Sequence, residues 1–134
     1  MPLKVLSNAY VILNRFILRA KVFLHDNYIV IKPLPKIGYV LTSVKGALSK
    51  REAELLIKSA LSTSEITINK DDVQGIEYAT LRKNRRDIAE LFDVEEIKGN
   101  IYRVTIRYSD ENSVRLILPQ NEFMKLKNYL SKRK

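Results

Sequence analysis

Strict alternation of apolar or aromatic with polar residues between positions 102 and 108 constrains the fold more than any other feature of this sequence. In IYRVTIRY, every second side chain is apolar or aromatic, so an extended chain places these side chains on one face and the polar ones on the other. SDENS then predicts a turn, and VRLIL (114–118) returns as a second strand. The side chains expected to enter the core are Tyr102, Val104, Ile106 and Tyr108.

The last segment of the chain is predicted to be a helix. Pro119 ends the preceding strand, and Asn121 is a suitable cap for a helix over about 121–132. Phe123, Leu126 and Leu130 recur at helical spacing and form its apolar face.

A second hairpin is predicted near the N-terminus. The alternation within residues 16–24 also fits a helical stripe, but the turn-forming HDN (25–27) and the β-branched run YIVIK (28–32) favour two strands around a three-residue corner. The prolines and glycines of residues 33–47 predict a loop. Residues 8–15 keep a helical alternative, with Ser7 or Asn8 as the cap.

The middle of the sequence predicts one more helix and two further strands. Ser49 and Glu52 form a capping box in front of an apolar stripe, which predicts a helix over about 49–61. ITIN (66–69) predicts a strand, and after a turn at 70–72 another begins near Gly75. We therefore expect a single α+β domain over residues 1–134, with no internal repeat or linker.

Composition excludes several classes of protein. The chain has 134 residues, no cysteine and a formal net charge of +9. Disulfide scaffolds, thiolate metal sites and cysteine nucleophiles are excluded. The longest apolar run, Ala9 to Leu13, is far shorter than the ~20 residues of a membrane-spanning helix. Because no signal peptide is evident, we expect a cytoplasmic protein.

The single histidine is interpreted as a turn residue. His25 and Asp26 are adjacent in sequence, and on an extended chain adjacent side chains point to opposite faces. A catalytic pair needs side chains that converge, whereas His-Asp-Asn is typical of a polar hairpin corner. No metal-ligand spacing or glycine-rich phosphate loop is present. We therefore expect no enzyme activity, metal, cofactor or small-molecule substrate.

Basic residues are the candidate binding residues, and they fall into two segments. Arg19 and Lys21 lie on the polar side of the first predicted strand, and Lys32 ends the return strand. The second segment, LRKNRR, contributes Arg82, Lys83, Arg85 and Arg86. Such groups can neutralise phosphates. The alternative for LRKNRR is a solvated face that pairs with the acids Asp87 and Glu90 just downstream.

Three stretches resemble the pleckstrin-homology-like superfamily, in particular its GRAM-like members: AKVFLHDNYIVI, ITINKDDVQGIE and YRVTIRYSDENSVRLILPQNEFMKLKNYL. They are similar to the family's opening hairpin, to a strand that restarts after a turn, and to its last hairpin with the closing helix. The resemblance implies a PH-like barrel or a strongly bent antiparallel sheet. It also implies a binding module, with basic residues near the opening hairpin as phosphate ligands.

The expected function is therefore a small basic binding module without catalytic activity. Its anion-binding residues would be Arg19, Lys21 and Lys32, assisted by the segment that begins at Arg82. The expected partner is nucleic acid or an anionic membrane surface, both of which attract a positive protein. The alternative is a PH-like adaptor that binds another protein, an acidic one included, and whose positive charge is incidental. The oligomeric state is left open.

Overall fold

The computed structural model describes residues 2–13, 16–40, 65–82 and 99–131. The strands are β1 (Lys4–Leu13), β2 (Phe16–Leu24), β3 (Tyr28–Val40), β4 (Ile66–Asn69), β5 (Val73–Leu81), β6 (Ile101–Tyr108) and β7 (Asn112–Pro119). A 3₁₀ turn, η1 (Lys70–Asp72), joins β4 to β5, and the helix α3 (Gln120–Ser131) follows β7 directly.

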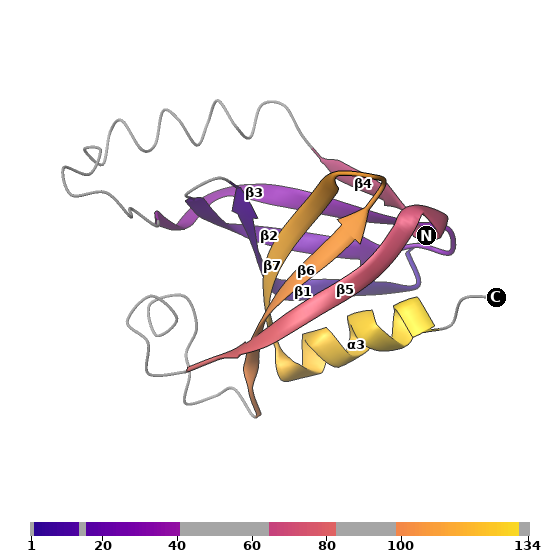
Figure 1. Ribbon diagram of the computed structural model, residues 1–134. Helices are drawn as coiled ribbons and strands as arrows, with labels where there is room; N and C mark the ends of the chain where they lie inside the picture. Colours follow the sequence, from indigo (N-terminus) through magenta and orange to yellow (C-terminus); the bar gives the residue numbers. More distant parts are fainter. Residues whose placement is uncertain (1, 14–15, 41–64, 83–98, 132–134) are drawn as a thin grey trace.

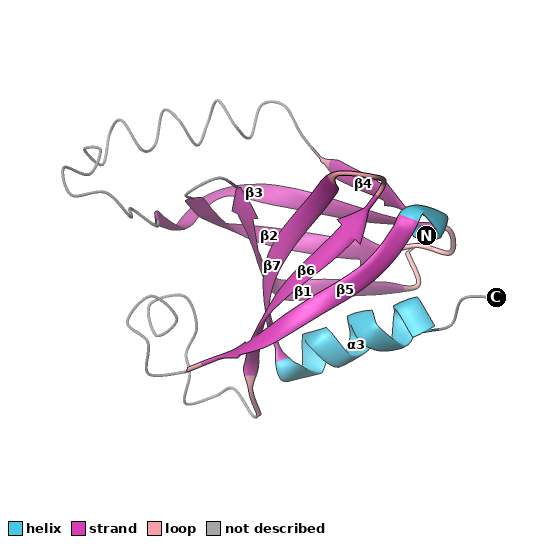
Figure 2. Ribbon diagram, viewed as in Figure 1, coloured by secondary structure: helices cyan, strands magenta, loops and turns pink. Residues whose placement is uncertain are grey.

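The seven strands form one sheet in the order β4-β3-β2-β1-β7-β6-β5, and every neighbouring pair is antiparallel. In Figure 1, β5, β6 and β7 cross in front of β2 and β3, so the sheet is strongly bent. Its edge strands β4 and β5 do not pair with each other in the described part of the chain, so the sheet is not closed there. The fold is α+β, with a bent antiparallel sheet and a C-terminal helix (Figure 2).

The core lies inside the bend and draws on both halves of the sheet. Leu6, Val22 and Ile29 come from β1, β2 and β3, and Val104 and Leu116 from β6 and β7; all five are fully buried. α3 contacts β1, β6 and β7. It adds four further buried apolar side chains to the core, Phe123, Leu126, Tyr129 and Leu130.

Strong alternation predicted the elements of the last third of the chain correctly. Strands occupy 101–108 and 112–119, and the final helix begins one residue earlier than expected and is described as far as Ser131. Tyr102 and Tyr108 pack against the core as expected, while Arg103 and Arg107 are exposed. The strands predicted at 16–24 and 66–69 and the turn at 70–72 are also confirmed.

Two expectations near the N-terminus are wrong. Residues 8–13 are part of β1, so the helical alternative for this stretch is wrong, and the register of β1 against β2 shifts between Leu6 and Ala9. Residues 33–40 continue β3 and are not a loop. Pro33 pairs with Ala20 where the register between β2 and β3 shifts, and a proline is tolerated at such an irregularity.

Some expectations concern residues outside the described ranges. The helix predicted at 49–61 and the bases Lys83, Arg85 and Arg86 lie there. Among the residues that the structure describes, no helix is both long enough and apolar enough to cross a membrane.

Candidate anion-binding face

Lys21 on β2 and Lys32 on β3 are direct cross-strand partners. Both side chains are exposed, and the flanking core residues Ala20, Val22 and Ile31 point the other way. Directly opposed residues of an antiparallel pair have Cβ atoms about 4.5–5.5 Å apart, and like charges in that position destabilise the sheet. The alternation of each strand and the register between them therefore place two lysines at directly opposed positions on the same face.

No carboxylate lies within ion-pair distance of either lysine in the described part of the chain. Across all seven strands, as far as they are described, Glu77 is the single acidic residue, and its carboxylate binds Arg107 at 3.0 Å on β5 and β6. Glu65 directly precedes β4, and the register between β3 and β4 places it opposite Lys32. Its carboxylate oxygens nevertheless lie more than 4 Å from the Lys32 ammonium nitrogen. Neither lysine of this positive pair therefore forms an ion pair within 4 Å in the described part of the chain, and Glu65 is the acidic residue next to them in register.

Arg19 lies on the same face of β2, one alternate position before Lys21, and its guanidinium is held by β1. One nitrogen donates to the Ser7 carbonyl oxygen at 3.0 Å and another to the Tyr10 hydroxyl at 3.4 Å. Its Cζ also lies 5.4 Å from the centre of the Tyr10 ring. Ser7 belongs to the irregular part of β1, so Arg19 stabilises that irregularity as well as adding charge beside Lys21.

The structure does not bring Arg82 to this face. Arg82 is exposed and directly follows β5, the opposite edge of the sheet. Three strands separate β2 from β5, which corresponds to about 19 Å along the sheet. Arg19, Lys21 and Lys32 therefore define the candidate site, which we call the β2–β3 face.

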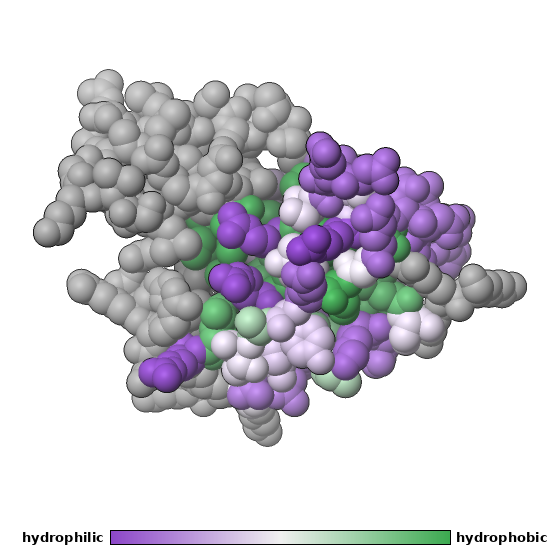
Figure 3. Space-filling model, viewed as in Figure 1, coloured by the Kyte–Doolittle hydropathy of each residue, from purple (hydrophilic) through white to green (hydrophobic). Residues whose placement is uncertain are grey.

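A second basic group lies on β6 and β7, outside the candidate binding residues predicted from the sequence. Arg103, Arg107 and Arg115 lie on the outer side of these strands, with Thr105, the direct partner of Arg115, between the other two. Figure 3, which shows the molecule from the side seen in Figure 1, has strongly hydrophilic side chains among hydrophobic ones over this region. The alternation of VRLIL already predicted that Arg115 points outward, and only the pairing with β6 shows the grouping.

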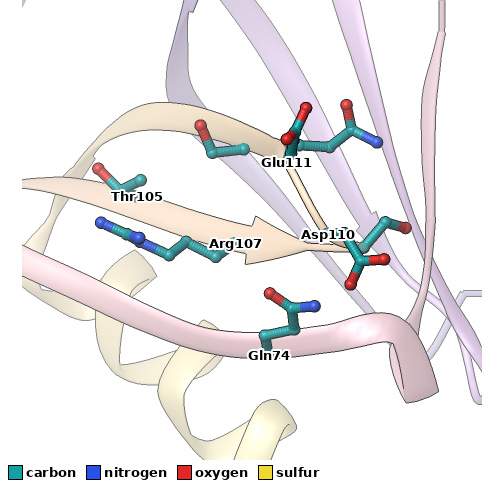
Figure 4. A pocket seen from close by; sticks show the side chains of 8 residues that line it. Gln74, Thr105, Arg107, Asp110 and Glu111 are labelled. Carbon is teal, nitrogen blue, oxygen red and sulfur yellow. The ribbon is translucent and has the colours of Figure 1, made fainter.

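A shallow, open hollow of about 240 Å³ lies beside Arg107 at the β6–β7 turn. Figure 4 shows Thr105 and Arg107 on β6, Gln74 on β5, and Asp110 and Glu111 in the turn. The one arginine already binds Glu77, and two further carboxylates line the hollow. This balance of charge makes the hollow a weaker anion site than the Lys21–Lys32 pair.

The polar corner is a turn in the structure, as expected. The His25 N–H donates to the Tyr28 carbonyl oxygen at 3.0 Å, and the two rings stack with centroids 4.4 Å apart. Within the described ranges, no group of three or more His, Asp or Glu side chains is placed to hold a metal ion.

No model of a known protein family matches this sequence, and no curated protein matches it either.

Proposed function

We propose that this chain is a binding module without catalytic activity that docks on the phosphate groups of an anionic partner through the β2–β3 face. The observation that carries the proposal is the direct opposition of Lys21 and Lys32, neither of which forms an ion pair with a carboxylate in the described part of the chain. A phosphate between two ammonium groups turns a repulsive contact into two charge-assisted hydrogen bonds. Phosphate binding would therefore offset the repulsion expected between the two lysines of the unbound protein.

A PH-like fold is part of this proposal. It is supported by the antiparallel pairing of β2 with β3, although β1 pairs with β2 before them, and by the last hairpin, which leads directly into a helix that packs on the core. A cytoplasmic location, where nucleic acid and anionic membrane surfaces are both accessible, fits the same function. The alternative is a protein adaptor whose positive charge is incidental.

Salt dependence separates docking on phosphate from incidental charge. We would measure binding of the full chain to a single-stranded oligonucleotide and to vesicles that contain phosphatidylserine, at low and near-physiological salt. Phosphate contacts release counterions, so affinity should fall steeply as salt rises. The Lys21→Gln/Lys32→Gln variant should bind at least about tenfold more weakly, and on the single-stranded oligonucleotide the salt slope should fall by about 1.4.

The matched control is Arg103→Gln/Arg115→Gln, which removes the same charge from exposed positions on β6 and β7. We expect this control to lose much less affinity than the lysine variant. Equal losses in the two variants would show that only net charge matters. Failure of the wild-type chain to bind either probe at low salt would leave the adaptor alternative.

A further inference from the structure

An apolar row lies directly beside the lysine pair on the same side of the sheet. Phe23 follows Lys21 by two residues on β2, and Val30 precedes Lys32 by two residues on β3, so each shares the outer side with its lysine. Phe23 pairs with Val30 on one side and with Val5 of β1 on the other. The outer side thus carries a basic row and, next to it, an apolar row.

The apolar row is accessible and continues beyond the three strands. Val5 is 38% exposed, and Leu3, whose N–H donates to the Leu24 carbonyl oxygen, is 60% exposed. Tyr28, 41% exposed, lies two residues before Val30 and therefore on the same side of β3. Three of the five large apolar side chains that are exposed in the described part of the chain gather here. A contiguous exposed apolar patch marks a binding surface.

We propose that the β2–β3 face docks on an anionic lipid bilayer, with Leu3, Val5 and Phe23 in the headgroup–acyl boundary and Lys21 and Lys32 on lipid phosphates. This inference rests on the proposed function, because it uses the same lysine pair. Membrane affinity combines buried apolar area with attraction of basic residues to anionic lipids, and the two adjacent rows supply both.

The chemistry of the apolar row favours lipid over nucleic acid. Proteins that bind single strands stack bases on aromatic rings. Leu3, Val5 and Val30 are aliphatic and suit acyl chains, and the aromatic Phe23 between Val5 and Val30 is partly buried. The Tyr28 ring already stacks on His25, with 14° between the ring planes, so one of its faces is occupied.

The acidic residues of this region define the orientation. Asp26 lies in the corner beyond β2, and Asp71 and Asp72 lie in η1, which contacts the corner through a hydrogen bond from the Lys70 N–H to the Asn27 carbonyl oxygen, at 2.8 Å. These three carboxylates lie beyond the strand ends and outside the two rows, whereas the exposed Glu65, next in register to Lys32, lies at the end of the basic row. The strands would therefore lie flat on the bilayer, because insertion of the corner would bring the carboxylates to the lipid phosphates.

The test compares two apolar variants of the full chain on vesicles of phosphatidylcholine with and without phosphatidylserine. Leu3→Ser/Val5→Thr changes the proposed contact, and Tyr78→Ser/Met124→Ser is the control, because Tyr78 (52% exposed) and Met124 (44% exposed) are apolar and lie elsewhere. All four side chains are exposed, and thermal unfolding verifies that both variants fold. We expect wild-type binding only with phosphatidylserine, and a loss of about tenfold in the first variant but not in the control.

The outcomes distinguish this inference from the proposed function. Equal vesicle binding by the first variant and the control would overturn the bilayer inference. Salt-dependent binding to the oligonucleotide without binding to vesicles would also overturn it, while the proposed function would stand. Failure to bind either probe, or binding that Lys21→Gln/Lys32→Gln leaves unchanged, would overturn both.

Discussion

Lys21 and Lys32 are direct cross-strand partners of like charge on β2 and β3, and the repulsion expected between them predicts opposite effects of one substitution on stability and on binding. Lys21→Glu would replace the like-charge contact with an ion pair to Lys32. We expect the free energy of unfolding to rise by about 0.2–1 kcal/mol. Binding to phosphatidylserine vesicles should nevertheless fall. Urea denaturation and vesicle co-sedimentation measure the two quantities.

Arg103→Glu is the control, since the direct partners of Arg103 on β7 and β5 are the uncharged Ile117 and Ala79. It should not stabilise the sheet in the same way. If Lys21→Glu were as destabilising as an ordinary surface substitution, the two lysines would not be in repulsive contact.

His25 is a corner residue, and its replacement should leave both the fold and the binding largely intact. His25→Ala removes the stacking contact with Tyr28, which is worth about 0.5–1.5 kcal/mol, and keeps the backbone hydrogen bond of the turn. Unfolding followed by circular dichroism should show a loss of stability within that range, and the change in vesicle-binding free energy should also stay within it. A large loss of binding in a well-folded His25→Ala protein would contradict the interpretation of His25 as a turn residue.

Whether Lys21 and Lys32 face each other depends on the number of residues in the turn between β2 and β3. The sequence does not define that number to within one residue. A three-residue corner at 25–27 would pair Leu24 with Tyr28 and place Lys21 opposite Ile31. The structure pairs Leu24 with Ile29, and this register brings Lys21 opposite Lys32. Alternation predicted which residues share a face, and the exact partner required the turn geometry.

At the scale of elements, strands and helices with a regular pattern could be predicted from the sequence, whereas interruptions of the pattern could not. β2, β6, β7 and α3 have uninterrupted patterns, and the boundaries of each were predicted to within about two residues. The irregularity between Leu6 and Ala9 disrupts the two-residue period of β1, and Pro33 suggested an end to β3 that the register shift accommodates. A β-bulge or a tolerated proline depends on the neighbouring strand, which a single segment does not reveal.

Gly99 determines how the chain enters β6, and only glycine suits its conformation. Its φ is 84°, and a Cβ at this position would overlap the side chain of Gln120, whose Oε1 accepts a hydrogen bond from the Asn100 N–H at 2.8 Å. We expect Gly99→Ala to lower the free energy of unfolding by about 1–3 kcal/mol. Gly75→Ala is the control, because a Cβ there meets no atom within 4 Å. Similar unfolding midpoints for the two variants would contradict this role.

Tyr129 connects α3 to the start of β3, because its hydroxyl donates to the Tyr28 carbonyl oxygen at 3.2 Å. Burial, and secondarily the negative charge of Asp26, raise the pKa of Tyr129 above its ordinary value of 10.0. The folded state therefore holds this proton more tightly than the unfolded state. The resulting stability is fully present below pH 10 and is lost as the pH rises through 10 toward the folded-state pKa.

Tyr129→Phe should cost about 1 kcal/mol at neutral pH, because the Tyr28 carbonyl loses its donor. The variant should also lose less stability than the wild type between pH 9 and about pH 11, since it has no hydroxyl to ionise. Urea denaturation across this range tests both effects. Identical pH dependence in the two proteins would show that Tyr129 ionisation is not linked to folding.

For the whole molecule, the bend of the sheet decides which charges can act together. Of the basic residues singled out in the sequence, Arg19, Lys21 and Lys32 share one face, whereas Arg82 follows the opposite edge strand. Buried Tyr10 and Ile117 separate the β2–β3 face from the arginines of β6 and β7. The net charge of +9 alone could not locate a site, since it attracts anions to any part of the surface.

The most direct measurement is a nuclear magnetic resonance titration of the uniformly ¹⁵N-labelled chain with inorganic pyrophosphate at low salt. If the β2–β3 face binds phosphate, the largest amide shift changes will occur at Lys21, Lys32 and their strand neighbours. They will disappear in Lys21→Gln/Lys32→Gln and persist in Arg103→Gln/Arg115→Gln. Changes centred on the arginines of β6 and β7, or uniform changes that both variants retain, would contradict the assignment of this face as the phosphate site.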